Sequence, residues 1–275
     1  MNDIELTAGR GISTDQTALW ARIRSEALEI SAREVGLRGF LDTAVFQNDG
    51  FAEALVKLLA RKLGDVFMSS DRLSALARGA FADDPAILAA AAADLAAITM
   101  RDPAAQNIST PFLYYKGFHA LEWHRVGNFL WRQGRREIAH FLQSRVSEVF
   151  AVDIHPAVPI GSGVFIDHGT GLVVGETSVI GNDVSILQEV TLGGTGKERG
   201  DRHPKVRDGV LLSAGAKVLG NIEIGRNAKV GAGSVVLTDV PPCATVAGVP
   251  ARIVGWCRET TPAHAMDQSL PERDG

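Results

Sequence analysis

Hydrophobic residues in the first 150 positions recur at the three- and four-residue spacing of amphipathic helices. Examples of this spacing are Leu19, Ile23, Ala27 and Ile30, then Phe51, Leu55, Leu58 and Leu59. Asp84-Pro85 and Thr110-Pro111 suit the first residues of helices, because a side-chain oxygen can accept from a free backbone N–H and proline lacks one. Asp102-Pro103 has the same form. We predict that this half is entirely helical, with one long helix over residues 111–132.

Beyond residue 150 the hydrophobic period changes to six. Branched aliphatic residues follow this period in two runs: Ile160, Ile166, Val174, Ile180, Ile186 and Leu192, then Val206, Leu212, Val218, Ile224, Val230 and Val236. The first run slips by two residues between Ile166 and Val174. A period of six fits neither a helix nor a long strand, so each unit must be a short strand followed by a turn. Repeats of this kind build a parallel β-helix, with three units to a triangular coil and the aliphatic residues inside.

The change of period, together with a rise in glycine content, places a domain boundary near residue 150. We predict an N-terminal extension over 1–16, a helical domain over 17–150, a β-helix over 151–258 and a flexible tail over 259–275. The tail is polar and lacks periodicity. A loop over 195–205 must leave the coil, since it supplies no inward aliphatic residue, and it carries Arg202 and His203.

Composition and charge exclude several classes of protein. Hydrophobic residues make up 45% of the chain and charged residues 22%, as in ordinary globular proteins. The 28 basic and 32 acidic side chains create no positive field for nucleic acid, and the apolar run over 86–93 is too short for a membrane span. The first 16 residues lack the pattern of a secretion signal, so we expect a cytoplasmic protein in which Cys243 and Cys257 need not pair.

Three segments carry the chemistry of the second half. They are Val152-Asp153-Ile154-His155-Pro156, Asp167-His168-Gly169-Thr170-Gly171, and the stretch from Gly193 to Lys205, which includes Asp201-Arg202-His203-Pro204. Together with Arg101-Asp102-Pro103-Ala104 and Lys116-Gly117-Phe118-His119 in the first half, they resemble the serine O-acetyltransferase family. The resemblance extends from about Leu19 to Gly255. Gly169 departs from the family, which usually has alanine there.

The resemblance implies an α+β fold, in which an all-helical N-terminal domain precedes a left-handed parallel β-helix of hexapeptide repeats. It also implies transfer of an acetyl group from acetyl-CoA to L-serine in cysteine biosynthesis, by a hexamer built as a dimer of trimers. In this family pattern His168 is the general base, Asp153 orients its imidazole, and His203 is a second histidine of the catalytic site.

The substrate-binding positions follow from the same resemblance. Asp102 and Asp167 are assigned to the ammonium group of serine, and Arg202 to its carboxylate. These roles agree with elementary chemistry, because a guanidinium fork matches a carboxylate. A serine hydroxyl is a poor nucleophile that needs a base with a pKa near neutrality, which histidine supplies.

Acetyl-CoA is expected along the prism between subunits, as a co-substrate rather than a permanently bound cofactor. The matching positions are Gly194, Ala214 and Ala232 for its pantetheine and Lys229 for its nucleotide end. No metal is required by the chemistry. Neither cysteine lies in a catalytic motif, so we expect direct attack of the hydroxyl on the thioester.

L-Cysteine is the expected feedback inhibitor, because it shares the ammonium and carboxylate of serine. Many relatives end in an isoleucine that binds O-acetylserine sulfhydrylase; this chain ends at Gly275, so we expect a weak complex or none. Three alternatives stay open. They are an acetyltransferase for another hydroxyl acceptor, a β-helix carbonic anhydrase with zinc on His155, His168 and His203, and a non-enzymatic assembly protein.

Overall fold

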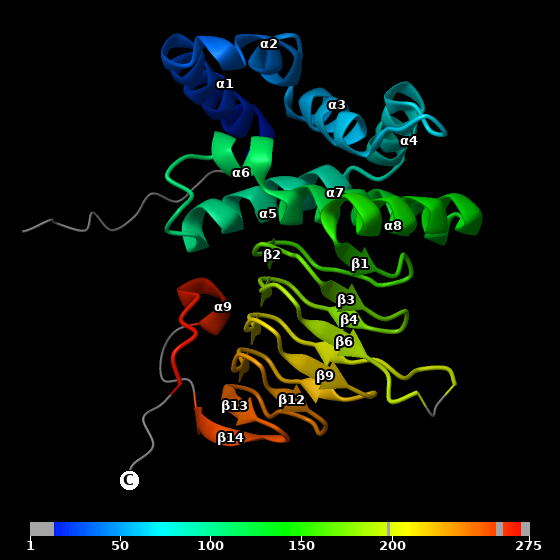
Figure 1. Cartoon of the computed structure of the whole chain (residues 1–275), viewed down its shortest axis with the longest axis vertical. Helices are drawn as coiled ribbons and strands as arrows, with labels where there is room; N and C mark the ends of the chain where they lie inside the picture. Colours follow the sequence, from blue (N-terminus) through cyan, green and yellow to red (C-terminus); the bar gives the residue numbers. More distant parts are fainter. Residues whose placement is uncertain (1–13, 197–198, 257–260, 271–275) are drawn as a thin grey trace, which may run out of the picture.

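A helical layer and a column of short strands form the two halves of the molecule (Figure 1). The computed structural model describes residues 14–196, 199–256 and 261–270. The predicted N-terminal extension lies almost wholly outside these ranges, as does the chain end at Gly275. The helices lie at one end of the column, and the loop after β6 projects from its side (Figure 1).

Amphipathic helices occupy the first half, as their three- and four-residue hydrophobic spacing predicts. The helical elements are α1 (Gln16–Arg33), η1 (Val35–Leu37), α2 (Arg38–Leu41), η2 (Asp42–Phe46), α3 (Phe51–Leu63), α4 (Ser70–Asp83), α5 (Ala86–Arg101), α6 (Ser109–Tyr114), α7 (Lys116–Arg132) and α8 (Arg136–Phe150). Asp15 caps α1 by accepting from the backbone amides of Thr17 and Ala18. Leu19, Leu55, Leu59 and Trp123 are among the side chains buried in the core of this half.

Two local predictions in this half are wrong. The long helix expected over 111–132 is broken at Tyr115, whose ψ of 113° is extended and separates α6 from α7. Asp102 does not begin a helix; it ends α5, and its side chain accepts from the backbone amide of Ala104. Local sequence does not distinguish these outcomes, because an aspartate before a proline suits a turn as well as a helix start.

The second half consists of coils whose strands from β1 to β13 pair in parallel. The strands are β1 (Val152–Ile154), β2 (Phe165–Ile166), β3 (Leu172–Val174), β4 (Val179–Ile180), β5 (Ser185–Ile186), β6 (Thr191–Gly193), β7 (Lys205–Val206), β8 (Leu211–Leu212), β9 (Lys217–Leu219), β10 (Glu223–Ile224), β11 (Lys229–Val230), β12 (Val235–Val236), β13 (Ala244–Gly248) and β14 (Ala251–Trp256). They form three sheets, in the orders β1-β3-β6-β9-β12, β10-β7-β4 and β14-β13-β11-β8-β5-β2. From β1 to β13, successive strands fall in different sheets, so each coil has three sides; β14 turns back and pairs antiparallel with β13.

The period-six residues from Ile166 to Val236 are at most 2% exposed, so they form the interior of the coils. The predicted fold class, a helical domain followed by a left-handed β-helix, is confirmed by this arrangement of parallel sheets.

A buried charged cluster joins the two halves. Arg125 of α7 donates to Asp94 of α5 and to the carbonyl oxygens of Ile160 and Gly161 in the first coil. Asp94 accepts in turn from the backbone amide of Val164, at 2.7 Å. Glu122 lies 3.6 Å from Arg125, and burial raises its pKa well above the usual range. These bonds fix the first coil against the helices.

The segment after the last strand differs from the flexible tail that we predicted over 259–275. Within it, residues 261–270 include a short helix, α9 (Pro262–Ala265), which contacts α5 and β8. Pro262 and Ala263 are buried there, and Ser185 donates to the Ala263 carbonyl. The average polarity of the segment hides these few apolar contacts.

Cys243 is disulfide-bonded, which differs from the expectation that the cysteines need not pair.

Across the described residues, no helix combines the length and the apolar character that crossing a membrane requires.

Candidate functional site

The turn between β2 and β3 carries Asp167 and His168. It contains the two extra residues that appear in the sequence as the slip between Ile166 and Val174. His168 has a positive φ of 56°, and Gly169 and Gly171 follow it in the same left-handed region. Glycine tolerates this region best, so the Gly-rich sequence permits a turn that projects the His168 side chain, which is 72% exposed.

A pocket of about 430 Å³ opens beside this turn. Asp102, at the end of α5, and Tyr115, between α6 and α7, line it together with Asp167 and His168. Tyr115 donates its hydroxyl to Asp102 Oδ2 at 2.8 Å. The structure therefore brings three of the predicted site residues, Asp102, Asp167 and His168, around one pocket.

Burial and neighbouring carboxylates raise the pKa of two groups in this pocket, Asp167 and Tyr115. Burial and the Asp102 carboxylate raise the pKa of Asp167, and the imidazole of His168, 3.8 Å away, opposes the rise. Burial and the hydrogen bond to Asp102 raise the pKa of Tyr115 to about 12, so its hydroxyl stays protonated at neutral pH. Two carboxylates with one hydroxyl donor form a site suited to a small cation such as an ammonium group.

Arg202 and His203 form a second group on the far side of β3. Arg202 donates to Glu176 Oε2 at 2.8 Å and to the carbonyl of Gly200. Because Glu176 follows β3 in the chain and His168 precedes it, the two groups lie at different corners of the same coil. The structure of one chain does not bring Arg202 and His203 into the pocket of His168.

The hydrogen bonds of His203 define which of its ring nitrogens carries the proton. His203 Nδ1 accepts from the backbone amide of Thr177 at 3.2 Å, and the Thr177 hydroxyl lies 2.8 Å from the same nitrogen. An N–H can only donate, so Nδ1 is unprotonated and Nε2 carries the hydrogen of the neutral ring. Burial and Arg202 lower the pKa of His203, which favours this neutral form. Gly175 makes room for the ring, since a Cβ there would lie 2.1 Å from Nε2.

Asp153 lies on β1 and is bonded to a helix. Its Oδ1 accepts from Gln143 Nε2 of α8 at 2.7 Å, and Gln143 Oε1 lies 3.2 Å from His140 Nδ1. The turn that carries His168 packs on the start of β1, where Gly171 donates to the Ala151 carbonyl. The structure thus holds Asp153 and His168 on neighbouring segments, with their side chains in separate contacts.

The positions predicted for acetyl-CoA fall into two places. Gly194 lies against Arg202 and His203 after β6. The other three positions lie on the side of the coils formed by β8 and β11. They are Ala214, which comes after β8, Lys229, which is in β11, and Ala232, which comes after β11. The segment 267–270 already contacts that side, because Lys229 donates to the Ser269 carbonyl and lies 3.7 Å from Asp267.

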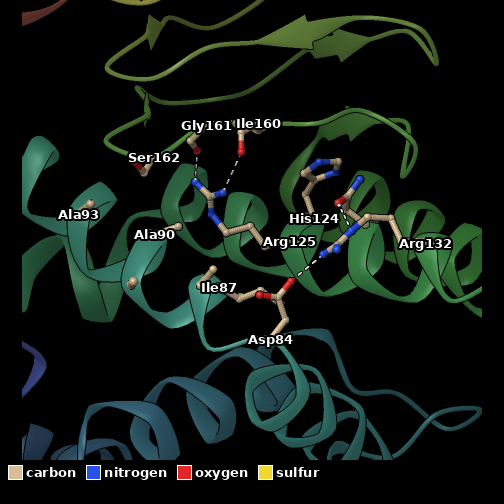
Figure 2. A pocket seen from close by; sticks show the side chains of 13 residues that line it. Asp84, Ile87, Ala90, Ala93, His124, Arg125, Arg132, Ile160, Gly161 and Ser162 are labelled. Carbon is tan, nitrogen blue, oxygen red and sulfur yellow. Dashed lines mark hydrogen bonds and ion pairs between the residues drawn. The ribbon is translucent and has the colours of Figure 1, made fainter.

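A second cavity, of about 450 Å³, lies between α5, α7 and the first coil (Figure 2). Its charged side chains are bonded to their neighbours: Arg132 pairs with Asp84, and Arg125 donates to the carbonyls of Ile160 and Gly161. Asp102, Asp167 and His168 line the other pocket, so we place the chemistry there. Within the described ranges, no three His, Cys, Asp or Glu side chains gather as a metal site would require.

Sequence reasoning missed three residues that contact the predicted site. Tyr115, Gln143 and Glu176 bind Asp102, Asp153 and Arg202 respectively. Two of them are close in sequence to features that the sequence analysis used. Tyr115 directly precedes the Lys116-Gly117 motif, and Glu176 comes two residues after the period-six residue Val174. Gln143 lies on an ordinary amphipathic helix and has no such signal.

Comparisons with known proteins agree over nearly the whole chain. A family model described as serine acetyltransferase, N-terminal, matches residues 19–123, and a bacterial transferase hexapeptide model matches residues 203–238. The chain is 54% identical to the serine acetyltransferase of Escherichia coli strain K12, covering 91% of this chain and 92% of that protein.

Two solved structures are also similar. One is a serine acetyltransferase in complex with cysteine, with a TM-score of 0.90, 51% identity, and coverage of 92% of this chain and 98% of that one. The other is a serine acetyltransferase from Brucella abortus strain S19 in complex with coenzyme A. Its TM-score is 0.86 at 48% identity, and the match covers 88% of this chain and 97% of that one.

Proposed function

The chain belongs to the serine acetyltransferase family and is an acyltransferase that moves acetyl from acetyl-CoA to L-serine, and we propose that His168 is its general base. The observation that carries this proposal is the meeting of Asp102, Asp167 and His168 around one pocket of about 430 Å³. The two carboxylates offer the ammonium of L-serine opposite charge, and the exposed imidazole stands beside them. A neutral sugar hydroxyl would leave these carboxylates without a partner.

The reaction balances with the two substrates alone. His168 removes the proton of the serine hydroxyl while its oxygen bonds to the thioester carbonyl carbon. When the carbon–sulfur bond breaks, the CoA thiolate takes the proton back from His168. His203, with hydrogen on Nε2, serves as a donor to the charge that develops on the carbonyl oxygen. It is a poor second base, because its Nδ1 is occupied by Thr177.

Arg202 is the proposed partner of the serine carboxylate. Arg202 Nη2 donates to Glu176 at 2.8 Å, so the carboxylate of serine shares or replaces that contact when serine binds. Asp153 is the proposed partner of the His168 imidazolium, which it reaches by turning from Gln143. Its position on the segment next to the His168 turn supports this role.

A trimer would explain why the two groups of site residues lie apart in one chain. Three-sided columns that pack side by side set one corner of a chain against a different corner of its neighbour. We propose that the His168 corner of one subunit meets the Arg202 and His203 corner of the next, in a hexamer built as a dimer of trimers. Acetyl-CoA then lies between subunits along Gly194, Ala214, Ala232 and Lys229, and replaces the contacts of Lys229 with residues 267–270.

L-Cysteine is the proposed competitive inhibitor, because it offers the same ammonium and carboxylate to Asp102, Asp167 and Arg202. The similar enzyme in complex with cysteine supports this assignment. Initial rates at several L-serine concentrations should give lines that meet at the same maximal rate as cysteine is added. An unchanged rate in millimolar cysteine would count against shared recognition of the two amino acids.

The acceptor itself is tested by following the release of the CoA thiol with a series of hydroxyl compounds. L-Serine should be the best acceptor, and glucose, galactoside and chloramphenicol should support no rate above hydrolysis. A sugar acceptor that outperforms L-serine would show that the two carboxylates do not set the specificity.

A further inference from the structure

The Tyr115 hydroxyl donates to the Asp102 carboxylate in the pocket beside His168. We propose that Tyr115 is a positioning residue for amino-acid recognition: its hydroxyl holds Asp102 in the orientation that receives the ammonium group of the acceptor. This inference rests on the proposed function, in which Asp102 and Asp167 bind that ammonium. Tyr115 acts through Asp102 and has no part in the proton transfer.

The backbone around Tyr115 directs its ring toward Asp102. Tyr115 is extended where α6 ends, and α7 begins at the next residue. The first turn of α7 is packed tightly on the strand before the His168 turn, since a Cβ on Gly117 would lie 2.0 Å from the Ile166 carbonyl oxygen. The same short segment therefore sets the positions of both Tyr115 and the strand that leads to Asp167.

Asp102 receives two donors at once. The backbone amide of Ala104 donates to Oδ1 and the Tyr115 hydroxyl to Oδ2, each at 2.8 Å. A carboxylate has about four lone-pair sites, so two remain for an ammonium group. With both oxygens held, the carboxylate cannot rotate freely, and the remaining sites keep a defined direction into the pocket.

The charges around Tyr115 keep it a donor. Asp102 and Asp167 face its hydroxyl, His168 lies beyond Asp167, and Lys116 is bonded to Thr170 on the other side of the turn. Burial raises the pKa of Tyr115 to about 12, together with the hydrogen bond to Asp102 and the charges of Asp102 and Asp167. The hydroxyl therefore stays protonated at neutral pH and donates to Asp102.

The test compares Tyr115→Phe with Tyr114→Phe. Both changes remove one phenolic hydroxyl from the lining of the same pocket, but the Tyr115 hydroxyl donates to Asp102, whereas Tyr114 stacks on Phe40 and its raised pKa has burial as its cause. We expect Tyr115→Phe to raise the KM for L-serine about tenfold, the scale of a lost hydrogen bond to a charged group, with kcat and the KM for acetyl-CoA within about twofold. Tyr114→Phe should leave all three constants within about twofold. An unchanged KM for L-serine in Tyr115→Phe would overturn the proposal.

Acceptor analogues separate ammonium recognition from a general loss of fit. 3-Hydroxypropionate is serine without its amino group, and ethanolamine is serine without its carboxylate. In Tyr115→Phe the preference for L-serine over 3-hydroxypropionate should shrink about tenfold, while the preference over ethanolamine stays as in the wild type. If both preferences fall together, Tyr115 supports the whole pocket and the proposed role is wrong.

A double-mutant cycle shows whether Tyr115 acts through Asp102. Tyr115→Phe in an Asp102→Asn background should add less than about twofold to the KM for L-serine, because the group that it positions is already gone. If the effects of the two substitutions on the KM for L-serine multiply, the two residues act independently and the proposal is overturned. If Tyr115→Phe does not fold, Tyr115→Leu, which is smaller and also lacks the hydroxyl, is compared with the wild type by the same acceptor panel.

Calorimetric titration with L-serine, without acetyl-CoA, keeps this inference apart from the proposed function. A wild-type enzyme that binds L-serine but does not acetylate it would reject the proposed reaction, while a tenfold loss of binding in Tyr115→Phe would still support the positioning role. Equal binding by the two proteins would overturn that role, whatever the reaction.

Discussion

The charged cluster at the domain junction and the pocket beside His168 contain similar groups in different surroundings. At the junction, the Asp94 and Glu122 side chains are 0% exposed and Arg125 is 8% exposed. The guanidinium stays charged, and its donors are taken by Asp94 and by backbone carbonyls of the first coil. Arg125 is therefore enclosed, its donors are already in use, and it does not lose its proton near neutral pH.

The pocket also has two carboxylates and one base. Here the base is His168, whose side chain is 72% exposed, and Asp167 beside it is 22% exposed. An imidazole can gain and lose a proton near neutral pH, and a solute can reach it. The comparison shows that residue types alone do not separate a structural cluster from a reactive one; access and the ability of the base to change charge do.

The largest expected effect tests the structural side of this comparison. Arg125→Leu leaves the Asp94 carboxylate buried without its cation, and it should lower the free energy of unfolding by about 3–5 kcal/mol. Arg132→Leu is the matched control, since Arg132 pairs with Asp84 at the surface and is 55% exposed. Its cost should stay below about 1 kcal/mol. Urea unfolding at equal protein concentration measures both, and equal losses would contradict the distinction.

The next effect tests the reactive side. His168→Ala should lower kcat by about 10² or more, the usual contribution of a general base, and should leave the melting temperature nearly unchanged because the side chain is exposed. His264→Ala, on α9, removes another exposed histidine and should leave kcat as it is. Retention of near-normal turnover by the His168 variant would reject the proposed mechanism.

Subunit mixing tests whether the pocket is completed by a neighbour. His168→Ala and His203→Ala chains should each be nearly inactive, and refolding them together at equal amounts should restore about a quarter of the wild-type activity. A site assembled from one chain would give no restoration. The measured fraction therefore reports directly how the two corners meet.

The smallest effect concerns the proton on Glu122. Its pKa is raised above the usual 4.5 in the folded protein, so the stability that it contributes is complete below pH 4.5 and is lost as the pH rises toward the folded value. Glu122→Gln has no such loss. The free energy of unfolding of the variant should therefore increase relative to that of the wild type as the pH rises above 4.5, by on the order of 1 kcal/mol at pH 8. Urea unfolding at several pH values gives the difference, and a difference independent of pH would show that Glu122 is ionised in the folded state.

The sequence by itself determined the architecture of the second half. Each of the three sides of a coil needs one inward aliphatic residue. The fold therefore produces a period of six in the sequence, and this period is visible without knowledge of any distant contact. The slip of two residues after Ile166 is visible in the same period, and in the structure it falls in the turn that carries Asp167 and His168. These signals are local, and the structure follows them closely.

Tertiary structure decided the contacts between distant segments. The sequence does not reveal that Asp102 is bonded to Tyr115, that Asp94 is bonded to Arg125, or that Ser185 is bonded to the segment beyond β14. Neither did the amphipathic pattern over 111–132 show the break at Tyr115, because hydrophobic spacing continues on both sides of it. Such features depend on which surfaces meet when helices pack on coils, and a hydrogen bond forms only where packing brings donor and acceptor within about 3 Å.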